Sequence, residues 1–501
     1  MGKLINHWID GKAYERVAER TGDVFNPATG EVASQVALAT PSIVDEAVES
    51  AWNASLTWRH VSLAKRTKVL FAFRQLVDKH TRELAKLLTL EHGKVTADAN
   101  GEVQRGLEVI EFACGIADLS KGEYSENVST EVDSYSIRQP LGVVAGITPF
   151  NFPAMVPMWM FPLAIACGNT FVLKPSERDP SASNFMAQLL TDAGLPPGVF
   201  NVVHGDKIAV DRLLTHPKIA AVSFVGSTPI AQYIYETGTK HGKRVQALGG
   251  AKNHMIVLPD ADMELAADAA VSAGYGSAGE RCMAISMLVG VGSAADRLVP
   301  LLKERIAKLK VGDGLDAASE MGPLINQAHL DKVRGYIDAG VTEGATLVTD
   351  GRGLSASSKG FFLGPCLFDN VKPNMSIYKD EIFGPVLSMT RVATFADAIE
   401  LVNKNPYANG VAIFTNDGGA ARKFQHDVEV GMVGINVPIP VPMAYYSFGG
   451  WKASLFGDHH IYGRDGVHFY TRTKAVTSRW PDPANRLAGG SGVNLGFPTN
   501  K

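Results

Sequence analysis

Residues 139–173, QPLGVVAGITPFNFPAMVPMWMFPLAIACGNTFVL, decide the fold, because they carry no charge and yet are rich in proline. The stretch exceeds the about 20 apolar residues that a membrane helix needs. However, every proline in it removes an amide donor that a helix in lipid could not replace. These prolines stand at positions 140, 149, 153, 157 and 162. We therefore predict a buried strand at GVVAGI, a turn, a helix and a second strand at NTFVL, inside a soluble domain.

The pattern continues on the C-terminal side of this stretch. Short apolar runs, FNVVHG, AAVSFVG and HMIVL, alternate with the helical segments 180–194 and 206–215. A second series follows, with AISMLVGVG, the helical segment 294–309, VLSMTRV and GVAIFT. Near-continuous β-branched runs that alternate with helices are typical of parallel sheets buried on both faces. The sequence thus predicts an α/β protein with two α/β domains.

The N-terminal side is predicted to be helical over 41–57 and 60–92, where apolar residues recur at helical spacing. Ser42 is a candidate cap for the first helix. In the second segment we expect a single apolar stripe, with Lys65, Arg66 and Lys79 on other faces. The stripe consists of Leu70, Phe71, Phe73, Leu76 and Val77.

Length and composition limit the class of protein. The 501 residues predict about three domains at ~150 residues each. The apolar fraction of 46% excludes wholesale disorder, and the net charge of −3 gives no electrostatic reason to expect nucleic acid or an anionic membrane as partner. The N-terminus lacks the apolar region of a signal peptide. Only four cysteines occur, none in a C-x-x-C pair, which favours a reducing compartment, and we expect a cytoplasmic protein.

Two glycine patterns imitate a dinucleotide-binding fingerprint. The first, Gly274 to Gly279, follows an alanine-rich helical run rather than a strand, and the second, Gly290 to Ala295, lacks the acidic residue expected about 20 positions later. For each we predict no more than a tight turn. P-loop, H-E-x-x-H and G-x-S-x-G motifs are absent from the sequence.

Three clusters are better candidates for chemistry. Cys282 stands between a glycine-rich turn and an apolar strand; it is either an inert core thiol or a nucleophile whose thiolate the adjacent Arg281 would favour. Asn151, between two prolines, is either a turn residue or a donor to an oxyanion. Lys174 and Glu177 follow the strand NTFVL, and α/β proteins bind ligands at the carboxyl ends of parallel strands.

Taken together, these motifs resemble those of a known family. TPFNFP (148–153), KPSE (174–177), FVGST (224–228), Cys282 and EIFGPV (381–386) occur in this order. With them, the chain resembles the aldehyde dehydrogenase superfamily over nearly its whole length. It is most similar to the CoA-acylating branch that oxidises methylmalonate semialdehyde. The segments TPFNFPAMVPMWMFPLA, GGAKNH, ERCMA, INVPIPVPM and SFGGWKASLFGD carry that narrower likeness.

The resemblance implies a domain organisation. A variant Rossmann domain that binds NAD would occupy 1–118 and 141–250, and an α/β catalytic domain would occupy 251–450. A small β oligomerisation element would combine 119–140 with 451–485, and 486–501 would be a C-terminal tail. The protein would be a homo-oligomer, a dimer of dimers.

The resemblance also implies roles for individual residues. Cys282 would attack the aldehyde, and Asn151 would stabilise the oxyanion, leaving a thioester that loses CO₂ and passes to the co-substrate CoA. The products would be propanoyl-CoA or acetyl-CoA, CO₂ and NADH. Arg105 and Arg281 would bind the carboxylate of the substrate. The cofactor residues would be Phe150, Lys174, Glu177, Gly226, Ser227, Glu381 and Phe383.

One position departs from the wider family. Ordinary members have a glutamate that activates water in the segment Glu-Leu-Gly-Gly, whereas Ala247 stands there in this sequence. This favours transfer to CoA over hydrolysis, unless another carboxylate such as Glu280 substitutes. A non-acylating dehydrogenase that releases the free acid is the nearest alternative, and a non-enzymatic relative is the more distant one.

Overall fold

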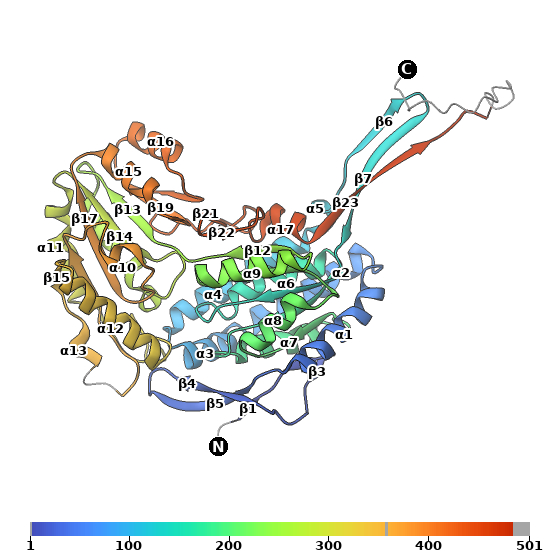
Figure 1. Ribbon diagram of the computed structural model, residues 1–501, viewed down its shortest axis with the longest axis horizontal. Helices are drawn as coiled ribbons and strands as arrows, with labels where there is room; N and C mark the ends of the chain where they lie inside the picture. The colour runs from blue at the N-terminus through green and yellow to red at the C-terminus, as the bar shows by residue number, and fades with distance from the viewer. Residues whose placement is uncertain (1–2, 356–358, 484–501) are drawn as a thin grey trace.

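Two largely parallel sheets form the centre of the protein, and the computed structural model describes residues 3–355 and 359–483 (Figure 1). The first sheet has eight strands. In spatial order they are β22 (Leu455–Phe456), β12 (Arg244–Leu248), β11 (Ile219–Val225), β8 (Val143–Ile147), β9 (Thr170–Lys174), β10 (Phe200–Val202), β2 (Trp8–Ile9) and β3 (Lys12–Ala13).

The five central strands of this sheet, β8 to β12, run parallel to one another. The chain adds β9 and β10 on one side of β8, and then returns to place β11 and β12 on the other side. The connecting helices are α6 (Met155–Ala166), α7 (Ser181–Asp192), α8 (Lys207–Thr215) and α9 (Thr228–Lys240). The reversal of strand order between β8 and β11 is the switch point at which open α/β sheets bind ligands.

The second sheet has seven strands, of which only the edge strand β15 is antiparallel. In spatial order they are β15 (Thr346–Thr349), β16 (Cys366–Asp369), β17 (Val386–Val392), β14 (Ile285–Val291), β13 (Asn253–Val257), β19 (Gly410–Phe414) and β20 (Met432–Ile435). Its helices are α10 (Met263–Tyr275), α11 (Ala294–Ile306), α12 (Gln327–Thr342), α15 (Phe395–Lys404) and α16 (Gly418–Asp427).

Both sheets are buried on both faces, as the near-continuous apolar strands predict. In β8, Val144 packs into the core beneath α6 and α7, while Val143 and Ala145 pack into the core beneath α8 and α9. In the second sheet, Met255 faces α10 and α11, and Ile256 faces α15 and α16. The predicted α/β class is therefore confirmed.

The remaining elements surround these sheets. The N-terminal helices are α1 (Pro41–Trp58), α2 (Leu63–Lys79), α3 (Thr81–His92), α4 (Thr96–Cys114) and α5 (Ile116–Leu119). A small N-terminal sheet contains β1 (Leu4–Ile5), β5 (Glu31–Ala37) and β4 (Thr21–Asn26). The short elements are α13 (Arg352–Ser355), α14 (Ser376–Lys379), α17 (Gly463–Phe469), β18 (Tyr407–Ala408), β21 (Trp451–Lys452) and the 3₁₀ turn Gly276–Gly279.

A three-stranded antiparallel arm projects from the body (Figure 1). It consists of β6 (Tyr124–Ser129), β7 (Val132–Pro140) and β23 (Thr471–Arg479), in the order β23-β7-β6. The arm joins the segment 119–140 to the segment 451–485, as far as the described residues extend. The predicted tail 486–501 lies outside them.

The decisive stretch 139–173 folds as predicted, into β8, a turn, α6 and β9, and α6 accommodates Pro162 in its interior. Within residues 3–355 and 359–483, no helix has the length and apolar character that a membrane crossing requires.

The prediction for residues 41–92 needs correction in detail. The first helix begins at Pro41 with Thr40 at the N-cap position, so Ser42 does not cap it. The segment 60–92 is two helices, α2 and α3, which meet at His80. Phe71 is 56% exposed and is not part of the buried stripe. Arg66 is buried because its guanidinium donates to the carbonyls of Val61 and Ala166.

The two glycine patterns are turns, as predicted. Gly274 and Gly276 lie at the end of α10, Gly290 is the last residue but one of β14, and Gly292 begins the tight turn from β14 to α11. A side chain at Gly290 would meet Ala295 at 2.6 Å, and Gly292 has φ +54°. Glycine is therefore required there by local geometry rather than by a ligand.

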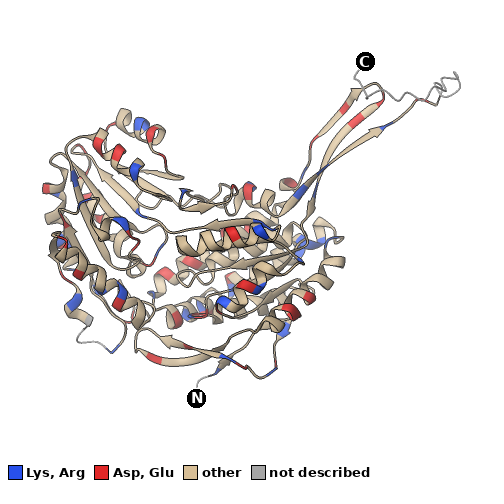
Figure 2. Cartoon of the chain, viewed as in Figure 1, with Lys and Arg blue, Asp and Glu red and all other residues tan. Residues whose placement is uncertain are grey.

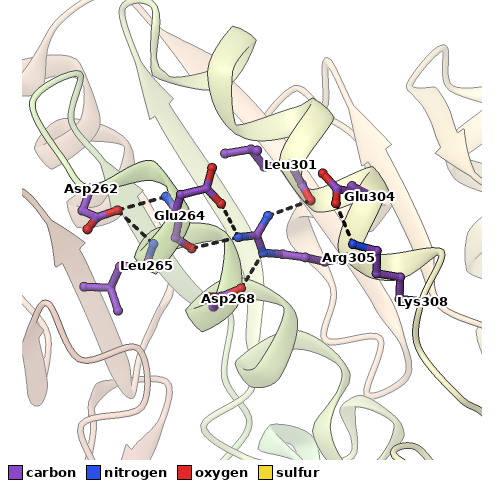
Figure 3. A network of polar contacts seen from close by, with 8 residues as sticks. All are labelled: Asp262, Glu264, Leu265, Asp268, Leu301, Glu304, Arg305 and Lys308. Atoms are coloured by element: carbon purple, nitrogen blue, oxygen red, sulfur yellow. Dashed lines mark hydrogen bonds and ion pairs between the residues drawn. The ribbon is translucent and has the colours of Figure 1, made fainter.

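Charged residues of both signs are interspersed along the helices (Figure 2). On the outer side of the second sheet, Arg305 of α11 pairs with Glu264 and Asp268 of α10, while Asp262 accepts from the first amides of α10 (Figure 3). Such exposed ion pairs contribute little to stability individually, and this network joins α10 to α11. Asp268 and Arg305 line a cavity that also contains Arg281.

Candidate active site

The candidate residues meet where the two sheets adjoin. Strand β12 ends at Leu248, and residues 249–252 lead directly into β13 at Asn253. The carboxyl edge of the first sheet therefore adjoins the amino edge of the second. Loops that follow β8 and β11 come from one side of this junction, and segments that precede β14 and β17 come from the other. A small cavity here is lined by Cys282, Asn253, Glu381 and Phe383.

Cys282 lies in the segment that precedes β14. Three consecutive residues with positive φ, Ser277 to Gly279, bend the chain before it. The Cys282 carbonyl accepts from the side-chain amides of Asn253 (2.9 Å) and Asn409 (3.2 Å), which fixes the main chain of the cysteine. The Cys282 side chain is partly buried, whereas the other three cysteines are fully buried.

The Cys282 thiol rests in the protonated form. Burial raises its pKa to about 12, and the negative charge of Glu381 acts in the same direction. The backbone amides of Cys282 and Met283, and then Arg281, act the other way but do not compensate. Arg281 favours the thiolate, as predicted, but burial and Glu381 outweigh its effect.

Arg281 has an ionic partner of its own. Its guanidinium pairs with Asp98 of α4 at 2.5 Å and lies against Gly276. This ion pair fixes the guanidinium beside α4.

Asn151 lies in the turn that follows β8 and is buried, with 3% of its surface exposed. Its main-chain carbonyl accepts from the Lys94 ammonium at 2.6 Å. Its side-chain amide makes no hydrogen bond within residues 3–355 and 359–483. A buried amide with an unused N–H is suited to donate to a ligand oxygen.

Lys174 and Glu177 lie at the carboxyl end of β9 and contact each other, with Nζ 3.0 Å from Oε2. Burial acts to raise the pKa of Glu177, but Lys174 and backbone hydrogen bonding outweigh it, so the pKa lies below its usual value. Glu177 is therefore an anion near neutral pH, at a strand end where a ribose hydroxyl could donate to it.

Gly226 and Ser227 lie between β11 and the start of α9, directly at the switch point. Ser227 occupies the N-cap position, and its side chain makes no capping hydrogen bond. A side chain at Gly226 would meet the ring of Phe224 at 2.5 Å. The first amides of α9 and the helix dipole form a place for a phosphate.

Glu381 faces the same junction from the segment before β17. Its Oε1 accepts from the amide of Ala251 at 2.9 Å, and burial raises its pKa. Lys252 holds this segment by donating to the carbonyls of Ile377 and Asp380, each at 2.7 Å.

The aromatic residues of the two predicted cofactor segments contact each other. The rings of Phe150 and Phe383 are 5.8 Å apart, and both pack against His329. Phe383 has φ +61°, and its carbonyl lies 2.6 Å from His329 Nε2. These contacts join the turn after β8 to the segment before β17.

Arg105 of α4 is not simply solvated. Its guanidinium donates to Glu108 (2.7 Å) and to the carbonyls of Val441 (3.1 Å) and Pro442 (3.3 Å). Within residues 3–355 and 359–483, Arg105 and Arg281 have no contact partner in common, since Arg281 binds Asp98. The Tyr462 hydroxyl donates to the same Pro442 carbonyl at 3.0 Å, and burial raises the pKa of Tyr462.

Neither candidate for the hydrolytic base faces the thiol. Ala247 is fully buried in the interior of β12, in the core beneath α9, rather than at the strand end. Glu280 is also fully buried, and its carboxylate lies 3.4 Å from His329 and 3.7 Å from His92. Of the carboxylates described, Glu381 is the one whose charge acts on Cys282.

Sequence reasoning missed several residues that hold this site. Lys94, Lys252, Asn409 and Tyr462 carry no pattern that distinguishes them from ordinary surface or core residues. Asn253 gave a usable signal, because it is a polar residue at the start of the apolar strand NHMIV.

Comparison with known proteins identifies the family that shares this arrangement. The model of the aldehyde dehydrogenase family matches residues 14–476. A malonate-semialdehyde dehydrogenase from Pseudomonas aeruginosa is 57% identical over 493 residues, which cover 97% of this chain and 98% of that protein.

Solved structures show the same similarity. A methylmalonate-semialdehyde dehydrogenase from Oceanimonas doudoroffii has a TM-score of 0.95 and 55% identity, over 97% of this chain and 100% of that one. A protein from Sinorhizobium meliloti, assigned the same activity and solved with NAD, has a TM-score of 0.95 and 53% identity, over 97% and 99% of the two chains.

Proposed function

This chain belongs to the aldehyde dehydrogenase family, and on that premise we propose that it oxidises methylmalonate semialdehyde, and malonate semialdehyde, with NAD and CoA. The products are propanoyl-CoA or acetyl-CoA, CO₂ and NADH. The relatives named above support a semialdehyde substrate. The observation in this molecule that carries the proposal is the cavity at the junction, where Cys282 lies beside Glu381 and Phe383, and where the Phe383 ring contacts Phe150 of the Asn151 turn. Arg105, held at the carbonyls of Val441 and Pro442, is the cation that we assign to the carboxylate of such an aldehyde.

The residues at the junction fit NAD. The phosphates would lie at the start of α9 beside Gly226 and Ser227, and Lys174 and Glu177 would hold the adenosine ribose. Glu381, with one oxygen held by Ala251, would hold the nicotinamide ribose, and Phe150 and Phe383 would pack beside it. Bound there, NAD would supply the hydride acceptor for the oxidation, and a thioester would remain on Cys282.

The chain's own residues supply the other steps. Cys282 gives up its proton to water, its sulfur forms a bond to the aldehyde carbon, and the carbonyl π electrons move to the oxygen. The amide of Asn151 and the backbone N–H of Cys282 donate to the resulting oxyanion. Arg105 binds the β-carboxylate, with Arg281 as a second cation next to the nucleophile in the sequence. When CO₂ leaves, the thioester carbonyl accepts the electron pair, and a proton then adds to the α-carbon.

The final step is transfer of the acyl group from Cys282 to the CoA sulfur. Alanine at position 247 supports this outcome, because it supplies no carboxylate that could activate water. CoA is a better acceptor than unactivated water, since its thiol ionises far more readily.

A product assay tests the proposal. One semialdehyde is supplied with NAD, and NADH, acyl-CoA and CO₂ are measured together. Without CoA we expect a burst of NADH equal to the active sites and then slow turnover, which CoA accelerates strongly. Rapid turnover without CoA, with the free acid as product, would instead identify a non-acylating dehydrogenase.

We propose the domain division and assembly that the family resemblance implies. Residues 1–118 and 141–250 would form the NAD domain, 251–450 the catalytic domain, and 119–140 with 451–485 the oligomerisation element. The assembly would be a dimer of dimers of 53.6-kDa subunits, which light scattering can test. The four unpaired cysteines support a reducing compartment such as the cytoplasm.

A further inference from the structure

A buried ion pair lies next to the turn that carries Asn151. Lys94 Nζ is 2.5 Å from Glu102 Oε2, and both side chains are fully inaccessible to solvent. Lys94 lies in the loop between α3 and α4, and Glu102 lies within α4. Burying two charges is costly unless their remaining hydrogen-bonding capacity is used. Here it is used on a single short segment, the turn from Thr148 to Met155.

Each member of the pair binds a different side of that turn. Lys94 Nζ donates to the Asn151 carbonyl at 2.6 Å and lies 4.4 Å from the centre of the Phe152 ring. Glu102 Oε1 accepts from the amides of Ala154 (2.8 Å) and Met155 (3.1 Å), the first amides of α6. The carboxylate therefore caps α6 from a distant helix, since Ala154 has no side chain that could do so.

The turn depends on these contacts because it has few donors of its own. Pro149 and Pro153 have no amide hydrogen, so they cannot supply the hydrogen bonds that normally fix a turn. The Asn151 side chain makes no hydrogen bond within the described ranges, so it does not hold itself in place.

We propose that the Lys94–Glu102 pair is a positioning device that aims the Asn151 amide at the aldehyde oxygen. The inference rests on the oxyanion role proposed for Asn151, and it assigns a purpose to two residues that touch neither substrate nor cofactor. An oxyanion donor is effective only when it is held in advance. Misplacement by about 1 Å can cost roughly 100-fold in rate, which sets the expected scale.

The test removes the pair without leaving an unpaired charge. Lys94→Met alone would strand a buried carboxylate and risk unfolding, so it is combined with Glu102→Gln, whose amide oxygen can still accept from Ala154 and Met155. The readout is the rate constant of the NADH burst with propanal and NAD, without CoA, which is independent of the acylating assignment. We expect this rate constant to fall by about 10- to 100-fold.

A double-mutant cycle with Asn151→Ala identifies the route. If the pair acts through Asn151, removing it in the Asn151→Ala background should change the burst less than about two-fold. Multiplicative losses would overturn the proposal and leave the oxyanion role intact. A normal burst in Asn151→Ala alone would instead refute that role, and the proposal with it.

Two controls separate positioning from general loosening. Alkylation of Cys282 by iodoacetamide forms no oxyanion, so the alkylation rate constant of the double variant should match that of the wild-type protein within about two-fold. A fall in this rate constant parallel to that of the burst would overturn the proposal.

Lys243 is a matched control, because it too is buried and donates to two carbonyls, those of His216 (2.5 Å) and Ile219 (2.8 Å), away from the junction. Lys243→Met should lower the melting temperature but not the burst, and an equal slowing of the burst would also count against the proposal.

Discussion

Introducing a carboxylate at Ala247 tests whether that position can ever serve the chemistry. Ala247 is fully buried within β12, where it pairs with Phe224 of β11 and Phe456 of β22. In the variant Ala247→Glu, the new side chain would enter the apolar core beneath α9, so the folded state would keep it neutral. We therefore expect loss of stability rather than gain of hydrolysis.

The magnitude follows from the cost of keeping a glutamate protonated. With an unfolded pKa of about 4.3, neutralisation costs about 3.7 kcal/mol at pH 7 and about 1 kcal/mol at pH 5. The folded pKa is raised, so the penalty is small near pH 4 and grows as pH rises, up to the folded pKa. Overpacking adds roughly 1–3 kcal/mol at either pH.

Urea unfolding at pH 5 and pH 7 measures this difference, with Ala247→Gln as the matched control. Glutamine has the same size and no charge, so its destabilisation should not change with pH in this way. CoA-independent NADH turnover is measured in parallel and should not increase. If the Ala247→Glu variant proved as stable as the glutamine control at both pH values, with faster hydrolysis, the reasoning would be refuted and the new side chain would belong to the active site.

Three further predictions concern the junction. Glu177, which is partly exposed, should disfavour the 2′-phosphate of NADP by about 2 kcal/mol through charge repulsion. Glu177→Gln should therefore lower the ratio of kcat/KM with NAD to kcat/KM with NADP. An unchanged ratio would show that the carboxylate points away from the ribose. Because the pKa of Cys282 is about 12, the rate of its alkylation should rise about ten-fold per pH unit from pH 7 to 9, and a plateau near pH 7 would contradict the raised pKa. Glu381→Gln removes a negative charge near the sulfur, so it should accelerate alkylation several-fold at pH 8. Arg105→Leu should raise KM for the semialdehyde roughly 30-fold, which corresponds to about 2 kcal/mol, and should leave KM for propanal nearly unchanged. An equal rise in KM for both aldehydes would mean that Arg105 only holds the loop 441–442 in place.

The fold was predictable because its strands carry a strong local signal. GVVAGI and NTFVL are β-branched and uncharged, and the prolines between them exclude a single helix, so the order strand, turn, helix, strand follows from the residues alone. The helix boundary at His80 was not predictable in the same way, because apolar residues continue at helical spacing across it. Likewise, the burial of Arg66 depends in part on the carbonyl of Ala166, which lies 100 positions away in the sequence.

The candidate site was predictable only where a residue type restricts the chemistry. A lone thiol between a turn and a strand could be singled out, but its raised pKa could not, since that depends on burial in the folded chain and on the charge of Glu381. Glu102 was missed because a charged residue within a helix usually lies on a solvated face.

The polarity of the two sheets explains why the site needs a third element. Donors arrive from the carboxyl edge of one sheet and the nucleophile from the amino edge of the other, so neither core alone fixes the distance between them. Helix α4 contacts both sides: Asp98 holds Arg281 beside the nucleophile, Glu102 holds the turn of Asn151, and Arg105 holds the loop at 441–442. These three residues recur at helical spacing and therefore share one face of α4. Substitutions on this face should change the geometry between the Asn151 amide and the Cys282 sulfur while leaving both sheets intact. Helix α4 is therefore the element through which the chemistry can be altered without unfolding the protein.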